Sequence, residues 1–369
     1  MDMVEKAVIN WMALSLMPGL GSRGICQLIE RFGNPKRVFD AAQNGQEESG
    51  IRKNVLPFLR DPAPFRERAE ALFKRLENGG ATAVCPDDED YPELLKEIAD
   101  PPAVLYVQGR LELLGSLCLA MVGSRAATSY GKRSSYSLAK ALASSGVTVV
   151  SGLAAGIDSE AHRGALAVSG ATIGVLGCGL DVVYPQQNSE LYAQIRETGL
   201  LLTEYPLGTR PDSYRFPARN RIISGLSRGV VVVEAARKSG SLITAEMALD
   251  EGRDVYAVPG QIDSFKSDGA HWLLQQGAKL VQSAEDILVE YTAVQGTGLE
   301  REDSFGAEEV HTDPEAQALL QQVDVYPISR DALIACSGMA SAKVAELLLL
   351  LELDGLIEML PGDEIRRIG

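Results

Sequence analysis

The feature that most constrains the fold is the stretch LAMVGSRAATSYGK at residues 119–132. It begins with four apolar residues, a length that suits a buried strand of a parallel sheet. The tight turn Gly123-Ser124-Arg125 follows, and Thr128 and Ser129 then each offer a side-chain oxygen as the cap of a helix over residues 130–145. The order strand, glycine turn, helix predicts one β–α unit of a parallel sheet.

This turn is suited to a phosphate group. Backbone N–H groups beside a helix N-terminus carry partial positive charge, and Arg125 adds a planar fork that can hold a phosphate through two hydrogen bonds. A purely structural turn is the alternative, because glycine turns follow many parallel strands. The dinucleotide fingerprint G-x-G-x-x-G is absent, since Arg125 and Thr128 occupy the positions of its second and third glycines. NAD is therefore not expected, and we predict no cofactor.

The same alternation continues from residue 117 to residue 283. Further strands are expected at residues 147–151, 172–176, 200–204, 229–234, 254–258 and 279–281. Helices are expected at residues 157–169, 189–198, 241–251 and 269–276. Repeated β–α units predict a doubly wound parallel α/β sheet with helices on both faces. Ligands of such sheets bind beyond the carboxyl ends of the strands, where Gly123, Gly152, Gly177, Gly179 and Gly240 should converge on one rim.

A second motif, YRFPARNRIISGLSR at residues 214–228, is basic and carries aromatic residues. Over residues 210–228 five arginines stand against one aspartate, a net charge of +4. Arginine with interleaved aromatic residues is typical of segments that bind single-stranded nucleic acid, because guanidinium contacts phosphate and a ring stacks on a base. We expect this segment to be a loop near the sheet rim. The alternative is that Arg219 or Arg221 pairs with an acid such as Glu234 and only holds the loop.

The flanks of this core differ from it in pattern. With 369 residues, two or three domains are expected. Residues 1–110 are predicted to be mainly helical, and the PGLGS turn between two early helices resembles a helix-hairpin-helix, with a packing corner as the alternative. Residues 111–290 form the predicted core, and the polar residues 291–312 a linker. Residues 313–369 show three helices and a hairpin, the pattern of a winged helix.

Charge is distributed unevenly along the chain. The net charge is −15, but residues 284–369 carry 5 basic and 18 acidic side chains, whereas residues 117–283 carry 16 and 14. The core is therefore free to attract phosphate. In the third helix of the predicted winged helix Lys343 is the one base, so we expect this tail to bind a protein partner or to cover the groove rather than to bind DNA.

Several classes of protein are disfavoured. No apolar run approaches a membrane span, the N-terminus has no signal-peptide pattern, and the scattered cysteines indicate reduced thiols, so we expect a cytoplasmic protein without a membrane. The three histidines lie far apart, which argues against a metal site or a histidine-based triad. Asp158, Glu234 and the Ser239-Gly240-Ser241 turn are the remaining chemical candidates. Each has a structural explanation as a helix-terminal acid, an ion-pair partner or a cap, although the serine turn could also bind an oxygen anion; no catalytic residue is predicted.

Together the motifs resemble the DNA-processing protein A family (DprA, also called Smf). The matching stretches are MVGSRAATSYG, VVSGLAAGIDSEAH, GVLGCGLDVVYPQQN, FPARNRIISGLSRGVVVVEAARKSGSLITA and EGRDVYAVPG, within residues 118–283. The resemblance implies an extended Rossmann-like core that binds single-stranded DNA, with a helical flank like a SAM or helix-hairpin-helix domain and a winged-helix tail. It implies protection of incoming DNA and loading of RecA during natural transformation in competent cells. It also implies a homodimer, placed loosely at residues 260–283, and no enzymatic activity.

The resemblance also implies a set of site residues. One wall of a basic pocket would hold Arg125 with the amides of Gly123 and Ser124, and the other wall Phe216, Arg219, Asn220 and Arg221; Gly152 joins them on the same rim. The chain departs from the family where many members place a lysine after the Tyr-Pro pair. It has Gln186-Gln187 there, which predicts a shorter reach of the groove.

Two other functions stay open on the residues alone. A nucleotide or nucleoside hydrolase on a related Rossmann-like fold would also have a glycine-rich phosphate rim. A winged-helix transcription regulator is the third possibility, and the strongly acidic tail counts against it.

Overall fold

A computed structural model describes residues 3–45, 53–168, 170–295, 314–323, 327–353, 356–360 and 362–367. The chain divides into two compact units, residues 1–297 and residues 298–369. Each unit has its own buried core. In the described residues no single helix combines the length and hydropathy of a membrane span; a bent pair of helices, Arg330–Ser337 and Ser341–Glu352, meets that test by length and composition only.

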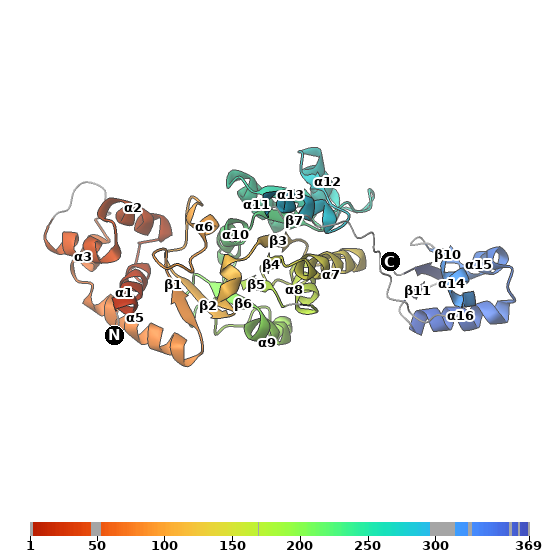
Figure 1. The fold of residues 1–369 in the computed structure, drawn as a ribbon, viewed down its shortest axis with the longest axis horizontal. Helices are drawn as coiled ribbons and strands as arrows, with labels where there is room; N and C mark the ends of the chain where they lie inside the picture. Colours follow the sequence, from red (N-terminus) through yellow and green to blue (C-terminus); the bar gives the residue numbers. More distant parts are fainter. Residues whose placement is uncertain are drawn as a thin grey trace. The chain divides into compact units, whose positions relative to one another are not determined.

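The first unit begins with helices, as predicted. They are α1 (Met3–Ser15), α2 (Ser22–Phe32), α3 (Pro35–Gln43), α4 (Leu56–Arg60) and α5 (Ala63–Asn78). Their apolar faces enclose Trp11, Met12 and Phe39, and this core continues into residues of the sheet such as Tyr106 and Leu201. The helical region is therefore packed onto the sheet through a shared core (Figure 1). The PGLGS turn separates α1 from α2, which leaves open both the hairpin and the packing-corner interpretations.

The centre of the first unit is a sheet of nine described strands in the order β1-β2-β6-β5-β4-β3-β7-β8-β9. The strands are β1 (Thr82–Val84), β2 (Leu105–Gly109), β3 (Cys118–Val122), β4 (Thr148–Ser151), β5 (Thr172–Val175), β6 (Leu200–Thr203), β7 (Gly229–Val232), β8 (Asp254–Ala257) and β9 (Lys279–Leu280). Strands β3 to β9 are all parallel to their neighbours among themselves. Strands β1 and β2 extend the sheet beyond β6 in antiparallel pairing. The predicted parallel α/β core is thus confirmed, with β3 near its middle.

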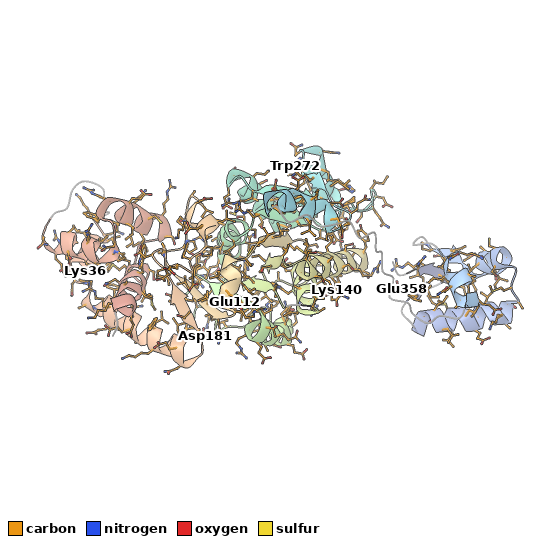
Figure 2. The ribbon with its side chains drawn as sticks, viewed as in Figure 1. Lys36, Glu112, Lys140, Asp181, Trp272 and Glu358 are labelled. Carbon is orange, nitrogen blue, oxygen red and sulfur yellow. The ribbon has the colours of Figure 1, made fainter. Side chains whose placement is uncertain are left out.

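Helices cover both faces of this sheet. Because the side chains of a strand alternate between the two faces, each central strand contributes to the core on either side. Leu119 and Met121 of β3 pack with α7 (Ser129–Ser144), α8 (Ile157–Leu166) and α13 (Glu285–Gln295). Ala120 and Val122 of the same strand face α10 (Arg215–Leu226), α11 (Gly240–Asp250) and α12 (Asp268–Gln275). Helix α12 also carries Trp272, partly buried against that core (Figure 2).

The remaining elements of the first unit are short apart from α9. They are α6 (Glu93–Lys96), the 3₁₀ turns η1 (Leu111–Gly115) and η2 (Gln186–Asn188), and α9 (Ser189–Thr198). One expectation was wrong. The arginine-rich segment is the helix α10 rather than a loop, because Ile222, Ile223 and Leu226 recur at helical spacing and are buried. Helix α13 spans the expected limit between the core and the linker at residue 290, and residues 296–312 of that linker lie outside the described residues.

The second unit has the predicted winged-helix pattern. Its elements are α14 (Pro314–Leu320), β10 (Ile328–Ser329), α15 (Arg330–Ser337), α16 (Ser341–Leu353), β11 (Ile357–Leu360) and β12 (Glu364–Arg367). The three strands form one antiparallel sheet in the order β10-β12-β11. Ser329 caps α15 by accepting a hydrogen bond from the Ala332 amide at 3.2 Å, as its sequence position suggests.

Candidate functional site

A cavity of about 470 Å³ opens at the carboxyl edge of the parallel strands. The strands after β3 run outward to one side as far as β6, and the chain then returns to place β7 on the other side of β3. Such a switch point leaves a crevice where the two connections part, and it is the usual ligand site of doubly wound sheets. The cavity wall contains residues that follow β3, β4 and β5 together with residues of α10 and α11.

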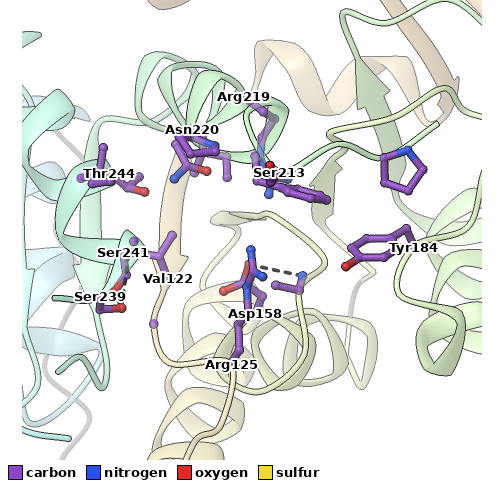
Figure 3. A pocket seen from close by; sticks show the side chains of 18 of the residues that line it. Val122, Arg125, Asp158, Tyr184, Ser213, Arg219, Asn220, Ser239, Ser241 and Thr244 are labelled. Carbon is purple, nitrogen blue, oxygen red and sulfur yellow. Dashed lines mark hydrogen bonds between the residues drawn. The ribbon is translucent and has the colours of Figure 1, made fainter. Parts of the chain in front are cut away.

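The structure places five of the eight predicted site residues in the cavity wall. These are Gly123, Arg125, Phe216, Arg219 and Asn220. Figure 3 shows Tyr184 on one side of the cavity and Ser239 and Ser241 on the other. Ser124, Gly152 and Arg221 are outside the wall, and each is held by other contacts. The glycine turn and the arginine-rich segment therefore meet at one edge of the sheet, as the sequence analysis required.

An aromatic and cationic stack forms one side of the cavity. The guanidinium carbon of Arg125 lies 5.5 Å from the centroid of the Phe216 ring, and the rings of Phe216 and Tyr184 stack with centroids 5.3 Å apart. A Cβ atom on Gly177 would lie 2.9 Å from Phe216, so the bare glycine makes room for that ring. Tyr184 is half-exposed, which leaves part of its ring open to a ligand. A planar group such as a nucleobase can stack here while Arg125 contacts a phosphate.

The glycine turn itself is fixed by Glu234. The backbone N–H of Ser124 donates to the Glu234 carbonyl oxygen at 2.7 Å, so this amide is not available to a ligand. The carboxylate of Glu234 accepts from the amide of Thr128 at 3.1 Å and from its hydroxyl. Of the two predicted caps of α7, Thr128 is the one that accepts from the Gly131 amide, at 3.0 Å. Glu234 is thus a structural acid, though its partner is a threonine rather than the arginine that we considered.

Arg219 is buried behind this stack and joins two strand ends. Its guanidinium donates to the carbonyl oxygens of Gly152, at 2.9 Å, and of Val175. The nearby carboxylate of Asp158 accepts from the amides of Gly152, at 3.1 Å, and of Ala154, at 3.4 Å. Burial raises the pKa of Asp158, and Arg219 partly opposes that rise. Burial likewise lowers the pKa of Arg219. The pair shapes the cavity floor.

Arg221 points away from the cavity. Its guanidinium donates to both carboxylate oxygens of Glu204, at 2.7 and 3.1 Å, and to Asp100 at 3.3 Å. The side chains of Arg221 and Glu204 are each 14% exposed, so this is a largely buried ion pair. The interpretation of Arg221 as a residue that pairs with an acid therefore agrees with the geometry, with Glu204 in place of Glu234. We leave Arg221 out of the proposed interface.

Tyr184 and Thr244 are among the residues of the cavity wall that the sequence analysis did not propose. Tyr184 could have been found as an aromatic residue in the connection after a core strand, whereas Thr244 carries no signal because it looks like an ordinary helix residue. Gln186 and Gln187, where the chain departs from the family pattern, begin the 3₁₀ turn η2. There the side chain of Gln186 donates to the Val183 carbonyl oxygen at 3.3 Å. Ser239 is the N-cap of α11, as one of our interpretations held.

Comparison with known proteins gives the class of protein that this fold and cavity define. Residues 82–292 match the family model described as DNA recombination-mediator protein A, and residues 305–363 match the DprA winged helix domain. Protein Smf of Synechocystis sp. is 40% identical over 402 residues, which cover 99% of this chain and all of that protein. The chain belongs to the DprA/Smf family.

Two solved structures from the same family resemble this one. The X-ray structure of DNA processing protein A from Streptococcus pneumoniae has a TM-score of 0.64 and 40% sequence identity, and the match covers 79% of this chain and 99% of that one. DNA processing protein A from Helicobacter pylori has a TM-score of 0.53 and 32% identity, with coverage of 59% and 97%. The Helicobacter pylori structure is described as giving insight into a unique single-stranded DNA binding mode of that protein.

Proposed function

We propose that this chain binds single-stranded DNA at the cavity beside β3, protects that DNA and loads RecA recombinase onto it during natural transformation. The observation that carries the proposal is the contact of Arg125 with Phe216, which stacks on Tyr184 at the rim. A duplex hides its bases in the stack, whereas a single strand can offer both base and phosphate to such a site. Family membership and the binding mode described for the Helicobacter pylori protein support the same ligand.

We further propose that the protein acts in the cytoplasm as a homodimer and that it has neither catalytic activity nor a cofactor. Residues 260–283 are the proposed dimer contact, and the exposure of Ile262 and Phe265, at 92% and 68%, supports it because such large apolar side chains are normally covered. The proposed domain limits remain those of the sequence analysis: 1–110, 111–290, 291–312 and 313–369. A hydrolase is less well supported, since Asp158 in the cavity wall already accepts two amide hydrogen bonds.

The experiment that tests this function compares single-stranded with double-stranded oligonucleotides by fluorescence anisotropy over a range of salt concentrations. Single strands should bind more tightly. Arg125→Ala should cost about 1.5–3 kcal/mol of binding free energy and lower the slope of log K against log salt by about one, as for one lost phosphate contact. Arg228→Ala is the matched control, because Arg228 is exposed and precedes β7 at the opposite edge of the sheet.

Two further assays separate the alternatives. RecA filament formation on single-stranded DNA should be faster with the protein than without it, and incubation with nucleotides should release no phosphate or base. If Arg125→Ala binds single strands as the unchanged protein does, the DNA site is elsewhere. Turnover of a nucleotide that disappears in a cavity variant would favour the hydrolase.

A further inference from the structure

Helix α11 directs its first turn into the cavity, opposite Tyr184 (Figure 3). Ser239 is the N-cap, and its hydroxyl lies 2.7 Å from the hydroxyl of Ser241. The Ser241 and Leu242 amides are bonded within this turn. In the part of the chain that the structure describes, the Gly240 amide has no partner. A free amide at the start of an eleven-residue helix, with the helix dipole behind it, attracts an anion.

A threonine hydroxyl in the same wall gives a second, independent sign of a ligand. Thr244 is 1% exposed, yet among the described residues its hydroxyl has no hydrogen-bond partner. A threonine inside a helix commonly donates back to the carbonyl four residues earlier, here Gly240, and this one does not. Asn220 of α10 also lines the cavity, and its side-chain amide is likewise without a partner in the described ranges. Both residues line the cavity, so these two polar groups are available to bond to a ligand there.

The charges around the turn favour a phosphate. Arg125 lines the same cavity, and Arg237 and Lys238 directly precede the cap; the guanidinium of Arg237 lies 4.6 Å from the ring centroid of Trp272. Two acids also line the wall. Asp158 is bonded to two amides beside Arg219, and Asp212 is exposed at the rim, where it accepts from Ser213 at 3.4 Å.

We propose that the first turn of α11, with Gly240, Ser241 and Thr244, is a phosphate subsite of the cavity. This inference rests on the proposed function, since the phosphate would belong to a bound DNA strand. A cavity of about 470 Å³ is within the range of small-ligand sites, so it can hold one nucleotide whose base lies toward Tyr184 and whose phosphate lies at α11. The phosphate of a free nucleotide has the same chemistry, and the test separates the two sources.

The sharpest variant is Gly240→Asp. A Cβ atom at Gly240 meets nothing within 4 Å, and an acid in the first turn of a helix stabilises that helix, so the variant should unfold at the same temperature or a higher one. The added negative charge would repel a phosphate and weaken binding of single-stranded oligo-dT by about tenfold or more. Gly115→Asp is the matched control. It adds the same charge at an open, exposed position before β3, at the opposite edge of the sheet, and should leave binding unchanged.

Thr244→Val supplies a test that adds no charge. Loss of one hydroxyl bond to a charged group should weaken binding by about tenfold, equally for oligo-dT and oligo-dA, because phosphate carries no sequence information. The salt dependence of binding should stay as in the unchanged protein, since valine and threonine are both neutral. A loss that differs between dT and dA would place a base edge at Thr244 and overturn the assignment.

Calorimetric titration of the full-length chain with dTMP distinguishes the two sources. A loss of affinity in Gly240→Asp for oligo-dT but not for dTMP assigns the subsite to the DNA backbone, and the reverse assigns it to a free nucleotide. If both affinities stay within about twofold of the unchanged protein, the subsite does not exist. Should the unchanged protein bind no single-stranded oligonucleotide, the proposed function fails, and the dTMP titration alone then decides the subsite.

Discussion

The guanidinium of Arg219 occupies the space that a side chain would need at Gly152. It donates to the Gly152 carbonyl oxygen at 2.9 Å, and a Cβ atom built on Gly152 would lie 2.5 Å from its nearest nitrogen. Gly152, directly after β4, therefore has no side chain, and this leaves room for the guanidinium of an arginine from α10. Because Arg219 also bonds the carbonyl oxygen of Val175, one buried cation ties β4, β5 and α10 together under the cavity.

Gly152→Ala should consequently destabilise the protein. The methyl group would force the guanidinium out of a closely packed position, and overpacking of this kind costs about 1–3 kcal/mol. Urea unfolding measures the loss, and single-strand affinity should fall with it because Arg219 lines the cavity. Gly115→Ala is the control, since its Cβ atom would meet nothing within 4 Å. Equal stability of the Gly152→Ala variant and the unchanged protein would mean that Arg219 moves aside freely.

The sequence predicts the frame of the site well because local rules set that frame. The apolar run before Gly123 and the threonine cap after it suffice to place a strand, a turn and a helix. The meeting of Arg125 with Phe216 follows from parallel strands that end at one edge.

What the sequence could not give is the direction of individual side chains. Arg219 and Arg221 are two positions apart on α10, a rotation of about 200°, so they must point to nearly opposite sides. We expected a loop, in which both could face a phosphate. The helix sends Arg219 beneath the cavity and Arg221 to Glu204, a partner seventeen residues earlier in the chain.

Arg221→Met should lower stability and leave DNA binding in place. The substitution leaves the largely buried carboxylate of Glu204 without its arginine partner. Removing one member of such a pair lowers the free energy of unfolding by about 3 kcal/mol. Urea unfolding and single-strand anisotropy, both performed well below the unfolding temperature, separate the two effects. The double variant Arg221→Met, Glu204→Gln should recover part of the stability, because it removes the unpaired charge. A loss of affinity without a loss of stability would restore Arg221 to the DNA contact predicted from the sequence.

His162 should make the protein less stable as the solution becomes acidic. Its Nδ1 lies 2.7 Å from the Thr172 hydroxyl, which gives its own proton to the Val149 carbonyl oxygen, so Nδ1 carries the hydrogen. Nε2 is buried without a partner, and burial, with help from Arg219, lowers the pKa of His162 from 6.5 to about 3. Between these values the unfolded chain binds more protons, so stability is full above pH 6.5 and is lost as pH falls.

The expected slope is about 1.4 kcal/mol per pH unit below pH 6, measured by urea unfolding between pH 7.5 and pH 5. His162→Leu should flatten that slope. The raised pKa of Asp158 acts in the opposite sense at lower pH, since protonation there favours the folded state, which is why the range stops at pH 5. The same slope in the variant and in the unchanged protein would show that another group is responsible.

Removal of residues 298–369 should leave single-strand affinity unchanged or raise it. The deleted unit has its own core around Leu319, Leu333 and Leu347, and the buried clusters of the first unit include none of its residues. These residues carry fifteen acidic and five basic side chains, a net charge of −10 that repels DNA. Lys343, the base of the third helix, is paired with Glu315 at 3.4 Å and Glu346 at 3.6 Å.

Anisotropy with the full chain and the shortened chain decides between the roles of this tail. An increase in affinity that disappears at high salt would mean that the acidic unit competes electrostatically with DNA, since salt screens such competition. Unchanged affinity would favour a role in binding a protein partner. A clear loss of affinity, with the shortened chain still folded by thermal unfolding, would contradict the prediction and assign DNA contacts to the winged helix despite its charge.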